Sequence, residues 1–122
     1  MQHTYSFEKL EVWQNSRQLV KKIYNLTSNF PNEETFGLTS QIRRATISIV
    51  SNLAEGSGRT SYKEKIRFIE IAYSSALEVY CQLVVAYDLN YITIEDLEDL
   101  KLNIYKITKM LSSLRRSMNE KS

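Results

Sequence analysis

The sequence predicts an all-α fold, a single antiparallel four-helix bundle that runs up-down-up-down. Three observations support this prediction. Apolar residues recur at helical spacing in four segments, residues that break helices gather between those segments, and period-two alternation persists nowhere. A chain of 122 residues suits one domain covering residues 1–122, and a domain of this length can fold without disulfide or metal support.

Each predicted helix has recognisable limits. The first ends before Pro31, because the residue that precedes a proline disfavours helical geometry. The second is expected to end at Gly56 in a left-handed conformation. The third and fourth begin with capping boxes that start at Ser61 and Thr93. The four helices are expected to span about residues 7–27, 38–55, 62–89 and 94–118.

The second and third helices carry more apolar surface than a bundle core requires. A second apolar cluster lies beside the main stripe of the second helix, and the third helix is apolar over roughly half its circumference. Tyr73, Tyr80 and Tyr87 belong to the core stripe of that helix and are expected to pack inside. We interpret the excess as an oligomer interface. A wide core covered by the 29–37 connector and the N-terminal arm is the alternative. The interface residues are expected to be Ile47, Val50, Ala54, Leu77 and Val84.

Charge is distributed in blocks, although the net charge is only +2. Residues 41–67 hold six basic and two acidic residues, and residues 68–100 hold seven acids and no Lys or Arg. Residues 101–122 hold six basic residues and one acid. Such blocks favour charge complementarity between copies or with an anionic partner. Mutual neutralisation across neighbouring helices within the bundle is the alternative interpretation.

Basic residues surround the predicted turn between the second and third helices, and they form the candidate nucleic-acid site. Hydroxyl and backbone donors of the same turn suit phosphate oxygens. A ring of copies would repeat this site around an axis and multiply a weak attraction. A solvated, partly ion-paired surface is the other interpretation. The candidate nucleic-acid-binding residues are Arg43, Arg44, Arg59, Lys63, Lys65 and Arg67.

The residues that catalysis or a bound metal would require are missing from the sequence. The single histidine, His3, lies close to the N-terminus, so no base is expected beside a Ser or Cys nucleophile and no zinc or di-iron ligand set is expected. Cys81 is expected to be a packed or half-packed thiol. We therefore expect a protein that is not an enzyme and uses no cofactor. We also expect a cytoplasmic chain without contact to a membrane, because the sequence shows neither a signal peptide nor a long apolar run.

Three segments resemble the four-helix-bundle family encoded in bacterial 23S ribosomal RNA intervening sequences. They are Phe7–Gln14 (FEKLEVWQ), Phe30–Ala45 (FPNEETFGLTSQIRRA) and Ser48–Arg59 (SIVSNLAEGSGR). The second and third segments are the most specific, and the resemblance extends over about residues 7–115. Leu53 departs from the family, which often has isoleucine there, and this exchange is conservative.

The resemblance implies an antiparallel four-helix bundle that assembles into ring-shaped homopentamers. It also implies kinship with the accessory proteins of diversity-generating retroelements, similar bundles with a basic surface that engage nucleic acid and a reverse transcriptase. The expected function is therefore a homo-oligomeric accessory protein that binds RNA or DNA, and a polymerase is the implied protein partner. A protein-interaction scaffold without nucleic-acid contact is the alternative. Arg43, Arg44 and Arg59 fall within the family motif, where they either bind RNA or bridge subunits.

Overall fold

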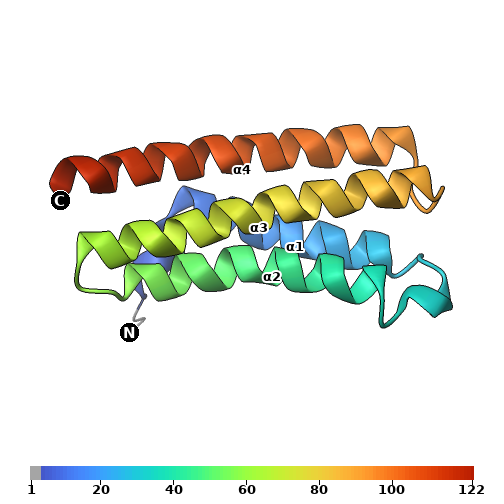
Figure 1. Ribbon diagram of the computed structural model, residues 1–122, viewed down its shortest axis with the longest axis horizontal. Helices are drawn as coiled ribbons and strands as arrows, with labels where there is room; N and C mark the ends of the chain where they lie inside the picture. Colours follow the sequence, from blue (N-terminus) through green and yellow to red (C-terminus); the bar gives the residue numbers. More distant parts are fainter. Residues whose placement is uncertain (1–3) are drawn as a thin grey trace.

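The structure is a computed structural model that describes residues 4–122, and over this range it contains four α-helices and no strand. The helices are α1 (Glu11–Thr27), α2 (Leu38–Ser57), α3 (Tyr62–Asp88) and α4 (Ile94–Lys121), with short 3-10 helices η1 (Ser6–Lys9) and η2 (Asn32–Glu34). Figure 1 shows that the connections alternate between the two ends of the bundle, so consecutive helices are antiparallel. The predicted all-α four-helix bundle is confirmed.

The core runs along the axis of the bundle, where the apolar stripes of the helices meet. Ile23, Ile49, Val79, Leu83 and Leu111 come from different turns of the four helices and expose none of their surface. α1 packs against α2 and α4, and α3 packs against the same two helices. The helices therefore stand in a square in chain order, and the α1–α2 side is opposite the α3–α4 side.

The chain enters the first helix differently from the prediction, which placed one continuous helix from about residue 7. Leu10 has extended backbone (φ −72°, ψ 123°) and separates η1 from α1. Leu10 is half-buried against the core, and the ring of Phe7 packs edge-on against Trp13 with 5.0 Å between centroids. The break lets the N-terminal segment fold across the end of the bundle instead of continuing along the axis.

Gly56 does not end the second helix in a left-handed turn, so that prediction is wrong. α2 continues to Ser57, and its C-cap Gly58 has φ −88°. Gly56 instead permits close helix packing, because a Cβ atom added there would lie 2.7 Å from Cβ of Phe68 on α3. Within residues 4–122, Asn90, which follows α3, is the non-glycine residue with positive φ (64°).

The third helix places two residues differently from the prediction. Tyr73 and Tyr80 pack partly buried against the core, as expected, but Tyr87 is exposed because it lies in the last turn of α3, where the bundle ends. Cys81 is also exposed and not packed. The exposure of Cys81 follows from the helical repeat, since Cys81 lies about 200° around the helix from the buried Leu83.

Ser61 and Thr93 cap the last two helices, as the sequence predicted. Ser61 Oγ accepts a hydrogen bond from the backbone N–H of Glu64 at 3.1 Å. Thr93 and Asp96 form the complete capping box, in which each side chain accepts a hydrogen bond from the backbone of the other residue. Both caps satisfy backbone donors that a helix leaves without partners in its first turn.

α3 is the most apolar of the helices. Within the described chain it is the one helix long and apolar enough, by composition alone, to span a membrane. A helix that contributes to the core of a helical bundle can pass the same test, and α3 contributes seven residues to the buried interior of this bundle. The composition of α3 therefore reflects its buried core stripe together with its additional exposed apolar surface.

Candidate functional surfaces

The structure divides five residues of the predicted basic cluster into two groups, and the sixth, Lys65, belongs to neither. Arg59, Lys63 and Arg67 are exposed at the turn between α2 and α3. Arg43 and Arg44 lie in the first half of α2. At a rise of 1.5 Å per residue, they are about 20 Å from this turn along the helix axis. The sequence placed all of them around one turn, because it shows their order but not their distances along the bundle.

Arg43 is engaged within its own subunit. Its Nε donates a hydrogen bond to Thr27 Oγ1 at 2.8 Å, and a terminal nitrogen donates to the Tyr24 carbonyl at 3.3 Å. The guanidinium carbon lies 4.4 Å from the centre of the Tyr24 ring. These contacts give the Tyr24 carbonyl, which also accepts from the Ser28 N–H, a further donor and attach α1 to α2, so Arg43 has a structural role in this fold.

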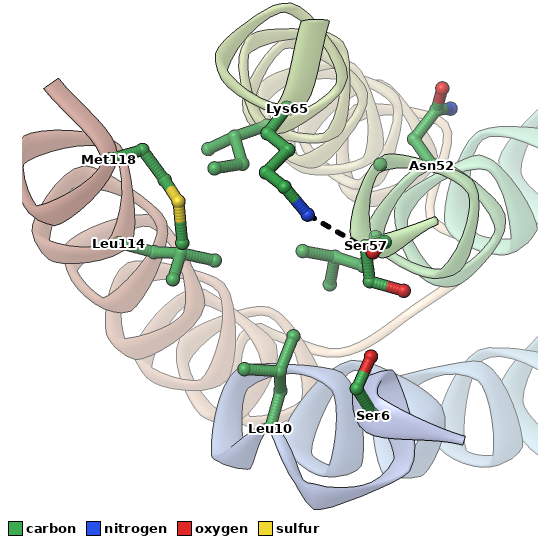
Figure 2. A pocket seen from close by; sticks show the side chains of 10 residues that line it. Ser6, Leu10, Asn52, Ser57, Lys65, Leu114 and Met118 are labelled. Atoms are coloured by element: carbon green, nitrogen blue, oxygen red, sulfur yellow. Dashed lines mark hydrogen bonds between the residues drawn. The ribbon is translucent and has the colours of Figure 1, made fainter. Parts of the chain in front are cut away.

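Lys65 points inward, into an apolar cavity at one end of the bundle. Its Nζ donates a hydrogen bond to the Ser57 carbonyl at 3.1 Å, as the dashed line in Figure 2 shows. Leu10, Leu114 and Met118 line the same cavity, which has a volume of about 210 Å³. Lys65 therefore stabilises the C-terminal end of α2, and it is turned away from the three exposed basic residues nearby.

Arg59, Lys63 and Arg67 form an accessible basic group, which we call the basic turn. The Arg59 guanidinium lies 4.7 Å from the centre of the Phe68 ring, which holds it against α3. Lys63 and Arg67 are four residues apart and so share one face of α3. Figure 1 shows that the C-terminal end of α4, which includes the exposed Arg116, lies at the same end of the bundle.

The opposite end of the bundle is acidic, and hydrogen bonds to Glu34 join its two connecting segments. Glu34 accepts hydrogen bonds from the Leu38 backbone N–H at 3.0 Å and from the Tyr91 hydroxyl at 2.8 Å. The hydrogen bond from the Leu38 amide, followed by that from Tyr91, lowers the pKa of Glu34, and the bond to Glu34 raises the pKa of Tyr91. Glu34 thus ties the connector before α2 to the turn between α3 and α4.

The predicted interface residues lie on two opposite sides of the bundle. Ile47 is 38% exposed and lies with the half-buried Val50 and Ala54 on the face of α2 that also carries Arg43. Because Arg43 contacts α1, we call this the α1–α2 face. The structure does not bring the residues of α2 and α3 into one patch.

The second face belongs to α3 and α4. Leu77 is 52% exposed, and Val84 is half-buried seven residues further along the same side of α3. Glu70, seven residues before Leu77, reaches Arg115 of α4 in an ion pair of 2.7 Å. This side therefore borders α4, whose Tyr105 is 60% exposed, and we call it the α3–α4 face.

Sequence reasoning missed several exposed apolar residues, and Phe36 and Leu102 are among the most exposed of them. Phe36, between η2 and α2, is 97% exposed, and Leu102 on α4 is 70% exposed. Leu102 departs from the three-four spacing of the α4 core stripe, and this was a signal that the sequence offered. Phe36 lies in a connector without periodicity, so its exposure could be known only from the structure.

The described part of the chain shows no ligand set for a metal. Among residues 4–122, no group of three or more His, Cys, Asp or Glu residues is placed to hold a metal ion. His3, the histidine considered as a catalytic base, lies outside the described residues. What the described residues offer chemically is a basic turn, an acidic end and two exposed apolar faces.

The fold and these surfaces define a class, a four-helix bundle with a basic turn and two exposed apolar faces. A family model described as 23S rRNA-intervening sequence protein matches residues 8–113. The chain belongs to this family, as its sequence motifs predicted. No curated protein is significantly similar to the chain.

A solved structure supports the same assignment. It is a protein of unknown function from the S23 ribosomal protein family of Bacteroides thetaiotaomicron, with a TM-score of 0.80 and 29% identity. The match covers 86% of this chain and 95% of that one. The two chains therefore share the whole bundle and not only a pair of helices.

Proposed function

We propose that this protein is a non-enzymatic, homo-oligomeric accessory protein that binds nucleic acid, RNA in particular, through the basic turn. The observation that supports the proposal most is the exposure of Arg59, Lys63 and Arg67 together at one end of the bundle. Such a group neutralises phosphates without reading bases, and its affinity depends on salt. The family description, 23S rRNA-intervening sequence protein, favours RNA over DNA.

Self-assembly strengthens this proposal. One basic turn can neutralise few phosphates, so a single chain would bind weakly at physiological salt. A closed ring, a pentamer by family resemblance, would present several copies of the turn to one RNA and raise the effective concentration of each. The exposed apolar α1–α2 and α3–α4 faces favour such assembly, because exposed apolar patches usually mark interfaces.

The basic turn can be tested by a triple substitution, Arg59→Ala, Lys63→Ala and Arg67→Ala. We expect binding to a labelled RNA hairpin to weaken, and the slope of log affinity against log salt to fall by about one for each phosphate that the variant no longer neutralises. The matched control is Lys21→Ala, Lys106→Ala and Lys109→Ala, which removes the same charge from exposed positions elsewhere. Equal binding by the two triple variants would exclude the basic turn as the RNA site.

A scaffold that binds another protein is the second candidate function. The exposure of Leu102 and Tyr105 on α4 favours it, since apolar side chains on one helix are typical of protein contacts. A protein partner, such as a polymerase, that remains bound after nuclease treatment would support this function. Release of the partner on nuclease treatment would instead support the nucleic-acid proposal.

A further inference from the structure

An apolar cavity lies at the end of the bundle that carries the basic turn. Its volume is about 210 Å³, and its wall comes from α2, α3, α4 and the segment before α1. Leu53 and Ile69 are its buried wall residues, and the half-buried Leu10, Leu114 and Met118 complete the apolar lining. Protein interiors hold few voids larger than a water molecule, so this space lacks contacts that a bound molecule would supply.

Lys65 brings a positive charge into this apolar cavity. Figure 2 shows its side chain reaching from α3 into the space between Met118, Ser57 and Leu10. An ammonium group has three N–H donors, and the Ser57 carbonyl accepts from one of them at 3.1 Å. Within residues 4–122 the Lys65 nitrogen makes no second hydrogen bond, so two of its donors are available to a ligand.

No carboxylate of residues 4–122 forms an ion pair with Lys65. The ten residues that line the cavity include neither Asp nor Glu. The ion pairs of the described chain join Lys22 to Asp99 and Arg115 to Glu70. A charge beside apolar surroundings is costly when it is unpaired. An anionic ligand at Lys65 would therefore provide a partner that the described residues do not.

The other polar residues of the wall contribute little to the interior of the cavity. Ser6 lies exposed at the rim in η1, where its hydroxyl can donate to an anion. Asn52 points away from the cavity in Figure 2, and its amide nitrogen donates to the Ser48 carbonyl at 2.8 Å. A wall that is mostly apolar, with few converging polar groups, is typical of small-molecule sites.

The volume of the cavity limits the size of the ligand. An apolar cavity of about 150 Å³ holds one benzene molecule. In proportion, the cavity of about 210 Å³ holds a hydrocarbon portion of about eight carbon atoms. Sites for drug-sized molecules usually begin at about 300 Å³, so the ligand is smaller than those.

We infer that this cavity binds a small amphiphilic carboxylate, with the carboxylate at Lys65 Nζ and the hydrocarbon chain between Leu114 and Met118. One ammonium balances the single charge of a carboxylate, whereas a phosphate monoester carries about 1.5 to 2 negative charges and would stay partly unbalanced. A charge-assisted hydrogen bond orients the head group, and burial of apolar surface binds the chain. The site does not use the basic turn, so this inference goes beyond the proposed RNA binding and does not depend on it.

Octanoate is the probe, because its chain length matches the volume of the cavity. The matched ligands 1-octanol and octylammonium have the same chain and a different charge, and calorimetric titration of the full chain measures all three. We expect octanoate to bind saturably with a Kd of about 1 mM or lower, and about tenfold more tightly than 1-octanol. Octylammonium should bind more weakly than 1-octanol. No saturable binding of octanoate at about 10 mM, or equal affinity for octanoate and either matched ligand, would overturn the inference.

Methionine-methyl NMR locates the ligand in the wild-type protein. Met118 lines the cavity and Met110 does not. The methyl signal of Met118 should therefore shift as octanoate is added and reach a plateau, while the signal of Met110 stays in place. A shift of Met110 without a shift of Met118 would show that octanoate binds elsewhere and would refute the site.

The role of the charge is tested with Lys65→Met, which keeps an apolar chain of similar length. The control is Lys106→Met, which removes the same charge from an exposed position on α4. We expect the Kd of octanoate to rise at least about tenfold for Lys65→Met and to keep the wild-type value for Lys106→Met. An equal Kd for Lys65→Met and the wild type would contradict the inference. If circular dichroism shows that Lys65→Met does not fold, the wild-type titrations with the three ligands test the charge without a substitution.

Discussion

Gly56 provides a direct test of the close contact between α2 and α3. In Gly56→Ala the new methyl group would lie 2.7 Å from Cβ of Phe68, a separation that forces the two helices apart. Overpacking of this kind costs about 1–3 kcal/mol, whereas alanine in place of glycine within a helix contributes about 1 kcal/mol. We expect a net decrease of about 1 kcal/mol in the free energy of unfolding, which corresponds to a decrease of about 4 °C in Tm.

The matched control is Gly58→Ala. Gly58 has φ −88°, which alanine adopts without strain, and an added Cβ would meet its nearest neighbour, the Glu55 carbonyl oxygen, at an ordinary 3.6 Å. This variant should be as stable as the wild type or more stable by up to about 1 kcal/mol. Urea unfolding followed by circular dichroism measures both. A Gly56→Ala variant as stable as Gly58→Ala would refute the close contact.

The contact at Gly56 also affects the basic turn. The ring of Phe68 that meets Gly56 is the ring on which the Arg59 guanidinium rests, 4.7 Å from its centre. Separation of α2 from α3 would therefore shift the support of Arg59. Core packing and the position of a candidate RNA-binding side chain are linked through one aromatic residue.

Two further predictions concern polar contacts between elements. Arg43→Ala should lower the free energy of unfolding by about 1–2 kcal/mol because it removes the hydrogen bond to Thr27 at 2.8 Å, and Arg44→Ala, at an exposed position, should be nearly neutral by the same urea assay. The depressed pKa of Glu34 implies stability that is present at neutral pH and disappears as the pH falls through that pKa. Tyr91→Phe should therefore have a lower Tm than the wild type at neutral pH, and the two Tm values should converge in acid. A difference in Tm that is constant across pH would contradict this role of Glu34.

The sequence by itself determined the helices and most of their limits. The three-four spacing of apolar residues, Pro31 and the caps at Ser61 and Thr93 are local signals, because a helix closes its hydrogen bonds over four residues. The three segments of family motif likewise needed no structure to be recognised, and the family match confirmed them.

Only the tertiary structure decided what individual residues do. Gly56 has a partner twelve residues away on α3, and Arg43 has one sixteen residues away on α1. Lys65 turns into a cavity while Lys63 stays exposed, although both belong to the same turn of one helix. Such outcomes depend on distances between helices, and periodicity along one helix does not contain them.

The tertiary structure also decided where the extra apolar surface of α2 and α3 lies. Ile47 and Leu77 looked like one surface because both are apolar positions outside the core stripes of adjacent helices. The square arrangement of the helices puts them on opposite sides of the bundle. Sequence patterns show how far each apolar face extends around its own helix, but the direction of that face is set by the neighbours that the helix packs against.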